Sequence, residues 1–422
     1  MIFTNARILT CDATNRVLDS GSVEIREDGT IGFVRPGRVR GGDPVDLGGR
    51  LLMPALINCH THLYSTLARG LVLPGPRPAN FTAVLKKLWW RLDRALNEED
   101  IYYSALVGLM DSAKCGVATV IDHHSSPGAC AGSLDQIDRA FRKIGLRGAT
   151  GYETSDRNGR ESARQAIAEN VRFIQRSRRG GLVRAAFGLH AAFTLGDRTL
   201  RACTEANQSL RAPFHIHVAE GLCDRAAVQR LDRFGILNDH TLAAHCVHVS
   251  AADRQALARR HVNVIHNPQS NCNNAVGTTD VLDLTRRGVL VGLGSDGYSP
   301  RLWDEFRTAL HVQTLKAHDP RRAYAGSLWN NRSIVKKLWG LDLGRIETGA
   351  SADLLVMDYF PPTPLTAGNL FGHLLFGVSN APVDSLIVNG RYVLRERNLV
   401  NVDGRRIAER AMARAKALWE RL

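Results

Sequence analysis

Eight apolar, β-favouring stretches recur through the middle of the chain, and polar residues follow at the end of each one. The stretches are LLMPALINCHTH (51–62), VATVIDHH (117–124), RGATGYE (147–153), VRAAFGLH (183–190), PFHIHVAE (213–220), TLAAHCVH (241–248), NVIHNPQS (263–270) and VLVGLGSD (289–296). Amphipathic or helix-favouring segments such as residues 96–116 and 133–145 separate them. Eight alternating strand and helix units predict an α/β fold with a closed, TIM-like (β/α)8 barrel.

Both ends of the chain show a different pattern, in which short strands are separated by turn residues. RILTCD, GSVEIRED and TIGFVRP lie near the start, and ADLLVMDY and VDSLIVNGRYVLRER lie near the other end. Asn389-Gly390 is a strong signal for a two-residue hairpin turn. The predicted units are a small β-sandwich domain from residues 1–52 and 350–400, a barrel domain over residues 53–349, and a C-terminal helix over residues 401–422. This helix is expected to pack on the body or on a second copy of the chain, and we expect a homodimer.

Composition narrows the class of protein. Hydrophobic residues make up 44% of the chain and charged residues 23%, values typical of a soluble globular protein. No apolar run reaches the roughly 18 residues that span a bilayer, so no membrane contact is expected. The first residues, MIFTNARILTCD, lack the basic start and long apolar core of a secretory signal. Eight cysteines occur without a C-x-x-C pair, which favours reduced thiols and a cytoplasmic protein.

The formal net charge of +14 raises the question of nucleic-acid binding. Of the 55 basic residues, 47 are arginines, and they are spread through the chain. No basic run is interleaved with aromatic residues in the way that a base-stacking surface requires. We therefore expect a small-molecule substrate and no nucleic acid, although a basic surface would favour an anionic substrate.

Two histidines, His60 and His62, end the first apolar stretch. Alternate residues of a strand point to the same face, so the two imidazoles would lie side by side and could share one metal ion. Two hydrogen-bonded histidines near a strand end are the alternative. The other strand ends favour the metal, because they also carry His, Glu and Asp where a barrel filled for stability needs Val, Ile and Leu. Such a rim is costly to desolvate unless its residues are paired or bind an ion.

The fifth strand offers two histidines and a glutamate. His215 and His217 share a face, and His217 is the better metal ligand because it lies nearer the carboxyl end of the strand. His215 is then expected to pack one layer deeper. Glu220 lies just beyond the strand, where it would either hang over a bound substrate or be a solvated loop carboxylate.

The sixth and eighth strands complete the set of candidates. Of the two histidines in AAHCVH, His245 is favoured, because His248 would lie in the following loop. The eighth strand ends in GLGSDG, which places Asp296 at the rim between small neighbours. A carboxylate there can bind a metal ion and also accept a proton from water.

In combination these motifs resemble the amidohydrolase superfamily, in the branch of cytosine, guanine and S-adenosylhomocysteine deaminases and triazine chlorohydrolases. The resemblance covers the whole chain, including GRIETGASADLLVMD and VNGRYVL near the end. Within that branch, HTHLYSTLARG, LWWRLDRALNEEDIYYSAL, TVIDHHSSP, YETSDRNG and HNPQSNCNNAVG are similar to the SsnA-type aminohydrolases associated with selenium metabolism.

The resemblance implies a role for each matching position. The implied ligands of one divalent metal ion, with zinc the best fit and iron(II) nearly as good, are His60, His62, His217 and Asp296. The implied catalytic residues are Glu220, His245 and Asp296. The implied substrate contacts are His190, Glu153 and His123, of which the last two are less general across the superfamily and would serve the subgroup's own substrate.

One absence and one departure complete the comparison with the family pattern. Members with two metal ions bridge them with a carboxylated lysine on the fourth strand, and this chain has no lysine from residue 144 to residue 315. A site with one metal ion is therefore expected. The usual Pro-Gly before the first barrel strand is Pro54-Ala55 here, a change expected to cost little.

The expected reaction is the metal-dependent hydrolytic deamination of a purine- or pyrimidine-like heterocycle with release of ammonia. Asp296 would accept a proton from the attacking water, His245 would orient the attacking oxygen, and Glu220 would protonate the ring nitrogen and then the departing amine. One alternative is that the same site opens a cyclic amide or displaces a halide. A second alternative, of another class, is a metal-binding accessory protein without catalysis in selenium or molybdenum-hydroxylase metabolism.

Overall fold

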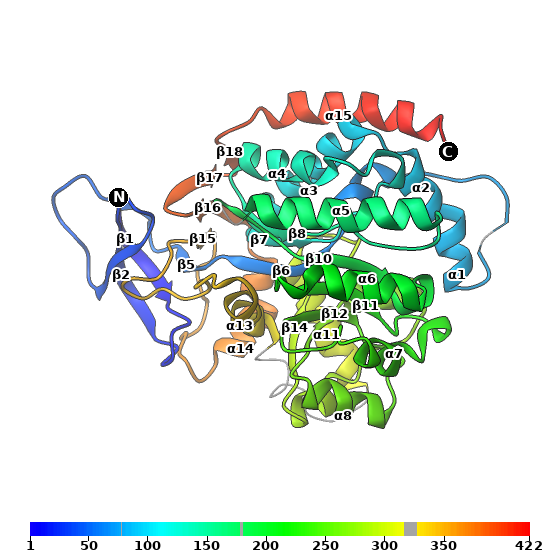
Figure 1. Ribbon diagram of the computed structural model, residues 1–422. Helices are drawn as coiled ribbons and strands as arrows, with labels where there is room; N and C mark the ends of the chain where they lie inside the picture. The colour runs from blue at the N-terminus through cyan, green and yellow to red at the C-terminus, as the bar shows by residue number, and fades with distance from the viewer. Residues whose placement is uncertain (77, 178–179, 316–326) are drawn as a thin grey trace.

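Two parallel sheets carry the middle of the chain in the computed structural model, which describes residues 1–76, 78–177, 180–315 and 327–422 (Figure 1). One sheet has the order β6-β7-β8-β9 and the other has the order β10-β11-β12-β13-β14. The strands are β6 (Leu56–Thr61), β7 (Val117–Asp122), β8 (Arg147–Thr150), β9 (Val183–Ala185), β10 (Phe187–Ala191), β11 (Phe214–Val218), β12 (Thr241–His245), β13 (Asn263–His266) and β14 (Leu290–Leu293). The fold is therefore mixed α/β with parallel sheets, as the sequence predicts.

Each of the eight predicted stretches contains a strand, but the fourth stretch is divided. β9 pairs with β8, whereas β10 pairs with β11, so the two sheets part at Ala186. Isolated parallel bridges, Thr154 to Leu189 and Thr61 to Asp296, join the edges of the sheets. In the described part of the chain the ladders thus form two open sheets rather than the one continuous closed barrel that the sequence predicts.

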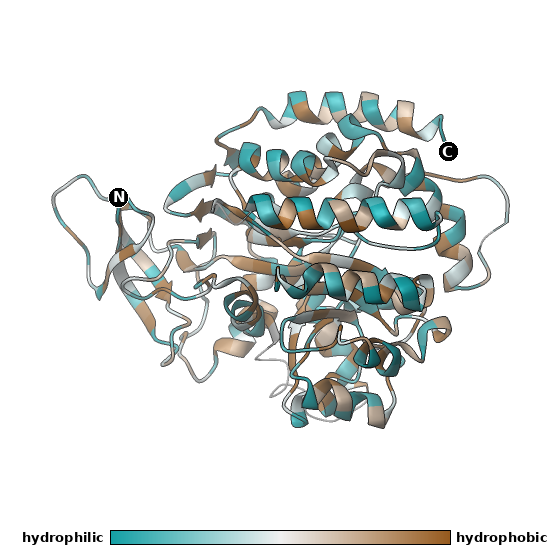
Figure 2. Cartoon of the chain, in the orientation of Figure 1, coloured by the Kyte–Doolittle hydropathy of each residue, from teal (hydrophilic) through white to brown (hydrophobic). Residues whose placement is uncertain are grey.

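Helices follow the strands, and their ends carry recognisable capping residues. Asn97 and Asp100 form a capping box at the start of α3, and Gly145, with φ of 93°, ends α4 in the left-handed region. The helices of the parallel region include α3 (Glu98–Lys114), α4 (Ser133–Ile144), α5 (Arg160–Ser177), α6 (Asp197–Gln208), α7 (Ala227–Arg233), α8 (Ala251–Arg259), α9 (Pro268–Asn273), α10 (Val281–Arg286), α11 (Leu302–Thr314) and α13 (Ser327–Trp339). Helices such as α5 mix hydrophilic and hydrophobic residues along their length, as expected of helices with one buried face (Figure 2).

Between β6 and α3, the residues that the structure describes form only short helical pieces. They are η1 (Leu63–Ala68), α1 (Phe81–Val84), the π-helical turn η2 (Leu85–Trp89) and α2 (Trp90–Ala95). None of the described helices is both long enough and apolar enough to cross a bilayer.

The two ends of the chain together build a nine-stranded sheet of order β18-β17-β16-β15-β5-β1-β2-β3, with β4 paired to β1. Its strands are β1 (Ile2–Leu9), β2 (Val17–Ile25), β3 (Ile31–Pro36), β4 (Val45–Asp46), β5 (Leu51–Pro54), β15 (Leu354–Met357), β16 (Val383–Val388), β17 (Arg391–Arg395) and β18 (Asn398–Leu399). Because β5 pairs antiparallel with β15, the terminal strand groups join in one sheet, whereas the sequence predicts a sandwich. The sheet also continues to Pro54, two residues past the predicted border at residue 52.

The predicted hairpin is visible near one end of this sheet. β16 and β17 form an antiparallel hairpin around Asn389 and Gly390, whose φ values of 52° and 74° suit a two-residue turn. The last helix, α15 (Gly404–Trp419), lies within the predicted range 401–422 and contacts α3, where the Arg414 guanidinium pairs with Asp100 at 2.9 Å.

Side-chain amides connect β6 to β14. The Asn331 amide nitrogen donates to the carbonyls of Ile57 (2.6 Å) and Leu293 (2.9 Å), and its oxygen accepts from the Leu293 amide (2.8 Å). The Asn58 amide nitrogen donates to the Ser295 hydroxyl at 2.8 Å. These buried bonds fix the first and last strands against each other.

Close packing at this junction requires a glycine. A Cβ on Gly294 would lie 2.6 Å from the Asn267 side-chain oxygen and 2.8 Å from both the His60 Cβ and an Ile265 methyl group. We predict that Gly294→Ala lowers the free energy of unfolding by about 1–3 kcal/mol, the usual cost of overpacking a core, and also weakens metal retention. Chemical denaturation and metal analysis of the purified variant measure the two effects.

Gly372→Ala is the matched control, because a Cβ on Gly372 in α14 (Leu370–Phe376) meets no atom within 4 Å. Equal unfolding midpoints for the two variants would show that the junction tolerates the extra carbon.

Candidate metal centre and active site

The strand ends bring His60, His62, His217 and Asp296 together. One ligand atom from each of these residues lies within 4.8 Å of the others. The His62 Nε2 atom is 3.1 Å from His217 Nε2 and 3.0 Å from Asp296 Oδ1, and His60 Nε2 is 3.6 Å from the same oxygen. The structure thus places all four sequence-predicted metal ligands around one point.

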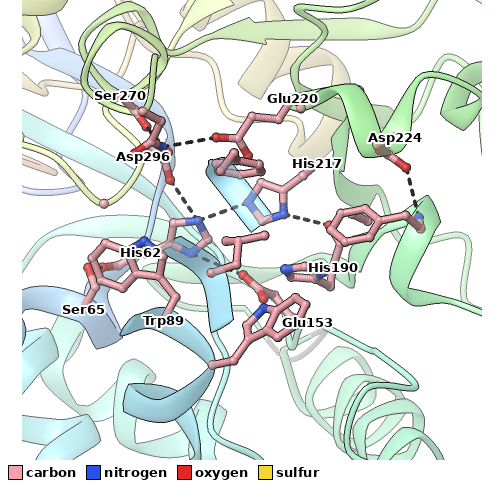
Figure 3. Close-up of a pocket in the computed structure, with 18 of the residues that line it drawn as sticks. His62, Ser65, Trp89, Glu153, His190, His217, Glu220, Asp224, Ser270 and Asp296 are labelled. Carbon is pink, nitrogen blue, oxygen red and sulfur yellow. Dashed lines mark hydrogen bonds and ion pairs between the residues drawn. The ribbon is translucent and has the colours of Figure 1, made fainter. Parts of the chain in front are cut away.

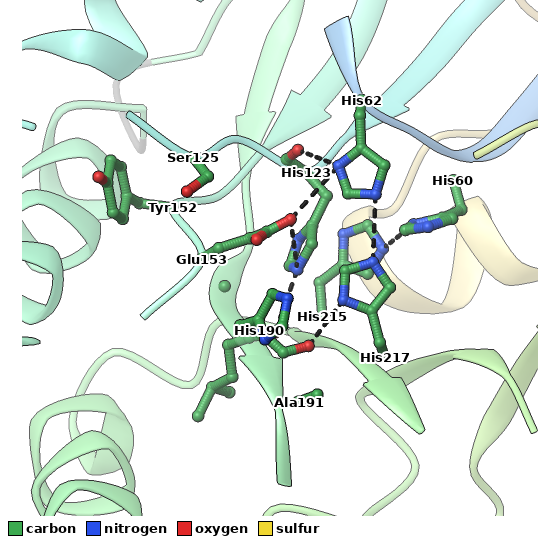
Figure 4. A network of polar contacts seen from close by, with 12 residues as sticks. His60, His62, His123, Ser125, Tyr152, Glu153, His190, Ala191, His215 and His217 are labelled. Carbon is green, nitrogen blue, oxygen red and sulfur yellow. Dashed lines mark hydrogen bonds and ion pairs between the residues drawn. The ribbon is translucent and has the colours of Figure 1, made fainter. Parts of the chain in front are cut away.

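Hydrogen bonds on the far side of each ring orient two of these histidines. His62 Nδ1 donates to the His123 carbonyl and His217 Nδ1 donates to the His190 carbonyl, each at 2.7 Å (Figure 4). A carbonyl can only accept, so Nδ1 carries the proton and Nε2 presents its lone pair to the centre. His60 Nδ1 contacts His215 Nε2 at 2.8 Å, so the predicted deeper histidine orients the third ring.

This arrangement fits a divalent cation. The lone pairs of His62 and His217 and an Asp296 oxygen face one another, which is unfavourable unless a positive charge lies between them. Burial alone would lower the pKa of His62, but the contact with Asp296 raises it to about 9, so a cation beside this carboxylate is favoured, either a proton on Nε2 or a metal ion in its place. His60 Nε2 is buried and has no hydrogen-bond partner among the described residues. Three imidazole nitrogens and one carboxylate form a ligand set that suits zinc.

Asp296 belongs to a second group of polar residues as well, together with His245 and Glu220. His245 Nε2 lies 3.5 Å from a Glu220 oxygen and 3.8 Å from Asp296 Oδ2, and its Nδ1 contacts the Asn271 side-chain oxygen at 2.8 Å. Asp296 Oδ2 also accepts a hydrogen bond from the Ser270 hydroxyl. Asp296 therefore turns one oxygen to the metal ligands and the other to the residues predicted to move protons.

The pKa values of Glu220 and Asp296 are shifted in opposite directions. Burial raises the pKa of Glu220 to about 7, close to the value that suits a proton shuttle at neutral pH. Burial acting alone would also raise the pKa of Asp296, but the contacts with His60 and His62 hold it well below its usual range. Asp296 is thus ionised at neutral pH, whereas Glu220 can gain or lose a proton.

Unusual backbone conformations turn the loops at the rim. Ala219, His245 and Asp296 have φ values of 48°, 72° and 54°, although none of them is glycine. Such conformations cost energy and are found where surrounding contacts enforce them, often at active sites. At Ala219 the contact is visible, because Asp224 accepts hydrogen bonds from the amides of Ala219 (3.0 Å) and Phe193 (2.9 Å).

A cavity opens over these two groups (Figure 3). Among the described residues, six aromatic side chains contribute to its wall: Tyr64, Phe81, Trp89, Trp90, Phe193 and Tyr298. His190 and Glu153, which the sequence predicts to contact the substrate, also line it. An aromatic cavity with a few convergent polar groups suits a flat heterocyclic ligand.

His123 has a different position from the other predicted substrate contacts. Its side chain is fully buried, its Nε2 donates to the Leu189 carbonyl at 3.1 Å, and its ring centroid lies 4.1 Å from that of His215. It is not among the residues that line the cavity. It therefore lies beneath the metal ligands, and its carbonyl, rather than its ring, reaches His62.

Several residues of the site were not among the sequence predictions. They are Arg157, Trp90, Asp93, Asp224, Ser270 and Asn271. The segments LWWRLD, YETSDRNG and HNPQSNC contain five of them, yet these segments served only as marks of resemblance. Their side chains follow the strands in loops and short helices, where spacing alone does not indicate direction.

Comparison with known proteins gives full-length matches. A model of the amidohydrolase family matches residues 51–393. A 5-methylthioadenosine/S-adenosylhomocysteine deaminase of Desulforudis audaxviator is 30% identical over 429 residues, covering 95% of each chain. A 5'-deoxyadenosine deaminase of Methanosarcina mazei is 28% identical, covering 100% of this chain and 99% of that protein.

Solved structures show the same fold. An adenosine deaminase from Xanthomonas campestris with bound zinc superimposes with a TM-score of 0.86 at 22% identity, covering 100% of this chain and 98% of the other. The atrazine chlorohydrolase TrzN from Arthrobacter aurescens, also with zinc, gives 0.80 at 20% identity, covering 99% of each chain. The match of the family model to most of the length, together with the relatives that span it from end to end, shows that this chain belongs to the amidohydrolase family.

Proposed function

We propose that the chain is a metal-dependent aminohydrolase that removes the amino group of a heterocycle and releases ammonia. The observation that carries this proposal is the sharing of Asp296 between two groups, the metal-ligand set with His60, His62 and His217 and the proton-transfer set with His245 and Glu220. Relatives that cover nearly the whole chain are named as deaminases of adenosine-like compounds, which supports the same class of reaction here.

The metal that we propose is one zinc ion per chain, held by His60, His62, His217 and Asp296. When bound, it would act as a Lewis acid and lower the pKa of a water molecule. None of the described residues that line the cavity is a lysine, and the fourth-strand stretch VRAAFGLH contains none, which supports a site without the bridging ligand of two-metal members of the family.

The chain's own residues account for the remaining proton movements. Asp296 accepts one proton from the attacking water while the new carbon–oxygen bond forms, and protonated Glu220 supplies a proton to the adjacent ring nitrogen. His245 Nε2 lies between these two carboxylates and orients the attacking oxygen. The remaining proton of the attacking oxygen passes through Glu220 to the amine, the carbon–nitrogen bond breaks, and ammonia leaves while the ring keeps a carbonyl in place of the amine. The proton held by Asp296 then returns to Glu220, which restores both carboxyl groups for the next reaction.

Ammonia is the product that distinguishes this reaction from its alternatives. Opening of a cyclic amide releases no ammonia, and displacement of a halide releases the halide. Glu220 favours deamination, because a group with a pKa of about 7 can protonate both a ring nitrogen and an amine. A panel of amino-substituted purines, pyrimidines and nucleosides, scored for ammonia, tests the proposal directly.

The finer architecture is part of the same proposal. We infer that the two parallel sheets are two parts of one eight-stranded barrel, because isolated parallel bridges join Thr61 to Asp296 and Thr154 to Leu189 at their edges. The nine-stranded sheet would be a separate small domain. An apolar cluster of its own supports this division, with Phe3, Ile8 and Ile387 among its members.

Three predictions follow from the proposed function, and the first concerns metal stoichiometry. Because four candidate ligands surround one point and the fourth-strand stretch VRAAFGLH contains no lysine, the purified protein should retain about one equivalent of zinc or another divalent ion after desalting. Elemental analysis measures the ratio. Retention of two equivalents, with both needed for activity, would contradict a site with one metal ion.

The second prediction concerns Glu220. Glu220→Gln keeps the shape of the side chain but cannot transfer protons, so turnover should fall by about 10²–10⁴-fold while metal content stays unchanged. Glu161→Gln, at an exposed glutamate of α5, is the control and should match the wild type in both measurements. Loss of metal from Glu220→Gln would instead identify this residue as a ligand.

The third prediction separates the two roles of Asp296. Asp296→Asn should weaken metal affinity and should also nearly abolish turnover with metal restored in excess, because the amide is neither anionic nor basic. His245→Asn should keep the metal and lose only rate. Metal titration and initial rates on both variants measure the difference. If metal-saturated Asp296→Asn turns over within about tenfold of the wild type, roughly 1.4 kcal/mol of barrier, Asp296 is not the base.

A further inference from the structure

A group of unpaired hydrogen-bond donors lies on the cavity wall beside the catalytic residues. Arg157 and Trp90 both line the cavity, and the Arg157 guanidinium carbon is 5.3 Å from the Trp90 ring centroid. One guanidinium nitrogen, Nη2, donates to Asp93 at 2.5 Å and to the Ser125 hydroxyl at 3.1 Å. These contacts fix the guanidinium plane against the tryptophan ring.

The remaining hydrogen-bond donors of Arg157 and Trp90 have no acceptor among the described residues. Arg157 Nε, Arg157 Nη1 and Trp90 Nε1 are buried and make no hydrogen bond to any residue that the structure describes. The Arg157 side chain is only 9% exposed, so bulk water does not satisfy these groups. Buried donors without partners are costly and uncommon in folded proteins. Their convergence on a ligand cavity indicates that a ligand supplies the acceptors.

The charges around Arg157 decide what kind of acceptor fits. Asp93 already pairs with the guanidinium, and the charge of Glu153 also acts on it. Glu153 lies on the same cavity wall, with one oxygen 3.3 Å from His62 Nδ1. Two buried carboxyl groups therefore face one arginine, and a third carboxylate from a ligand would add like charge in a desolvated site. An uncharged oxygen avoids this repulsion and still accepts the hydrogen bonds.

We propose that Arg157 and Trp90 determine substrate specificity by binding an uncharged oxygen of the substrate, while its amino-bearing carbon lies at Glu220 and Asp296. This inference rests on the proposed deaminase function and narrows its substrate class. The oxygen is either a ring carbonyl or a sugar hydroxyl, since both are neutral acceptors. Hydrogen bonds to a charged donor discriminate strongly between a ligand that has the acceptor and one that lacks it.

Matched compounds that differ only in the oxygen test this proposal. Guanine and 2-aminopurine carry the same reacting amine and differ in one ring carbonyl, as do isoguanine and adenine. Adenosine and 2',3'-dideoxyadenosine differ in the sugar hydroxyls. In at least one type of pair the oxygen-bearing compound should have a kcat/KM about 10- to 100-fold higher. The pair that shows the preference identifies the source of the oxygen.

Two variants test whether the Arg157 and Trp90 donors cause this substrate preference. Arg157→Lys keeps a cation beside Asp93 but removes the planar guanidinium, and Trp90→Phe keeps an aromatic ring but removes the N–H group. Each should reduce the preference to within a few-fold of unity. Arg142→Lys is the control, because Arg142 pairs with Asp138 on α4 away from the cavity and should keep the wild-type preference.

Three outcomes would overturn the proposal. The first is a wild-type enzyme with no preference in any pair, and the second is a preference that survives in both Arg157→Lys and Trp90→Phe. The third is a preference for S-adenosylhomocysteine over 5-methylthioadenosine that Arg157→Lys removes, because the donors would then bind a carboxylate.

Calorimetric binding separates this inference from the proposed function. If no compound releases ammonia, the deaminase proposal fails, but the binding of hypoxanthine and of purine to the zinc-loaded protein still tests the donors. Hypoxanthine carries a carbonyl that purine lacks, and neither compound has an amine to lose. If hypoxanthine binds more tightly than purine and Arg157→Lys abolishes the difference, the specificity role of Arg157 is supported. Equal binding of the two compounds to the wild-type protein would contradict it.

Discussion

The junction between β6 and the end of β14 is the constraint on which the whole site depends. The His60 carbonyl accepts hydrogen bonds from the amides of both Ser295 and Asp296, each at 2.9 Å, and the Thr61 hydroxyl donates to the Asp296 carbonyl at 2.8 Å. These bonds hold Asp296 opposite the two histidines of the first strand. Without them the first and last strands of the parallel region, more than 200 residues apart in sequence, would not bring their side chains to one point.

For His62 and His217, the backbone of one strand end orients the side chain of another. The carbonyls of His123, after β7, and His190, in β10, hold the rings of His62 and His217. The proton on each Nδ1 is thereby fixed, and the lone pair on each Nε2 is left for a cation. This arrangement satisfies buried polar groups and prepares the metal site with the same hydrogen bonds. Such preorganisation is the main way in which a protein site stabilises developing charge.

The walls of the cavity come from less regular parts of the chain than its floor. The proposed metal ligands, Asp296 among them, lie at strand ends or just beyond them, whereas Tyr64, Phe81, Trp89 and Trp90 come from the short helical pieces between β6 and α3. This division fits a family in which relatives with one fold carry the names of deaminases with different substrates. Chemistry depends on the rigid strand ends, and choice of substrate depends on the segments that cover them. The resemblance to the SsnA-type subgroup stays a prediction.

The sequence by itself determined those features that depend on local geometry. Alternation along a strand placed His60 and His62 on one face, position within the fifth strand favoured His217 over His215, and Asn389-Gly390 indicated its hairpin. The lack of lysine in the fourth strand follows directly from the sequence. These features follow from the repeat of the strand and the conformations open to each residue, so a short stretch contains enough information to predict them.

The tertiary structure alone decided what depends on contacts between distant segments. It assigned β5 to the terminal sheet through pairing with β15, divided the fourth strand at Ala186, and placed the ring of His123 beneath the cavity. It also brought Arg157 against Trp90 and left their donors without acceptors. The physical reason is that register between strands and the direction of a loop side chain are fixed by hydrogen bonds and packing with residues far away in sequence. The residues that are neighbours in the sequence do not indicate which distant residues these partners are.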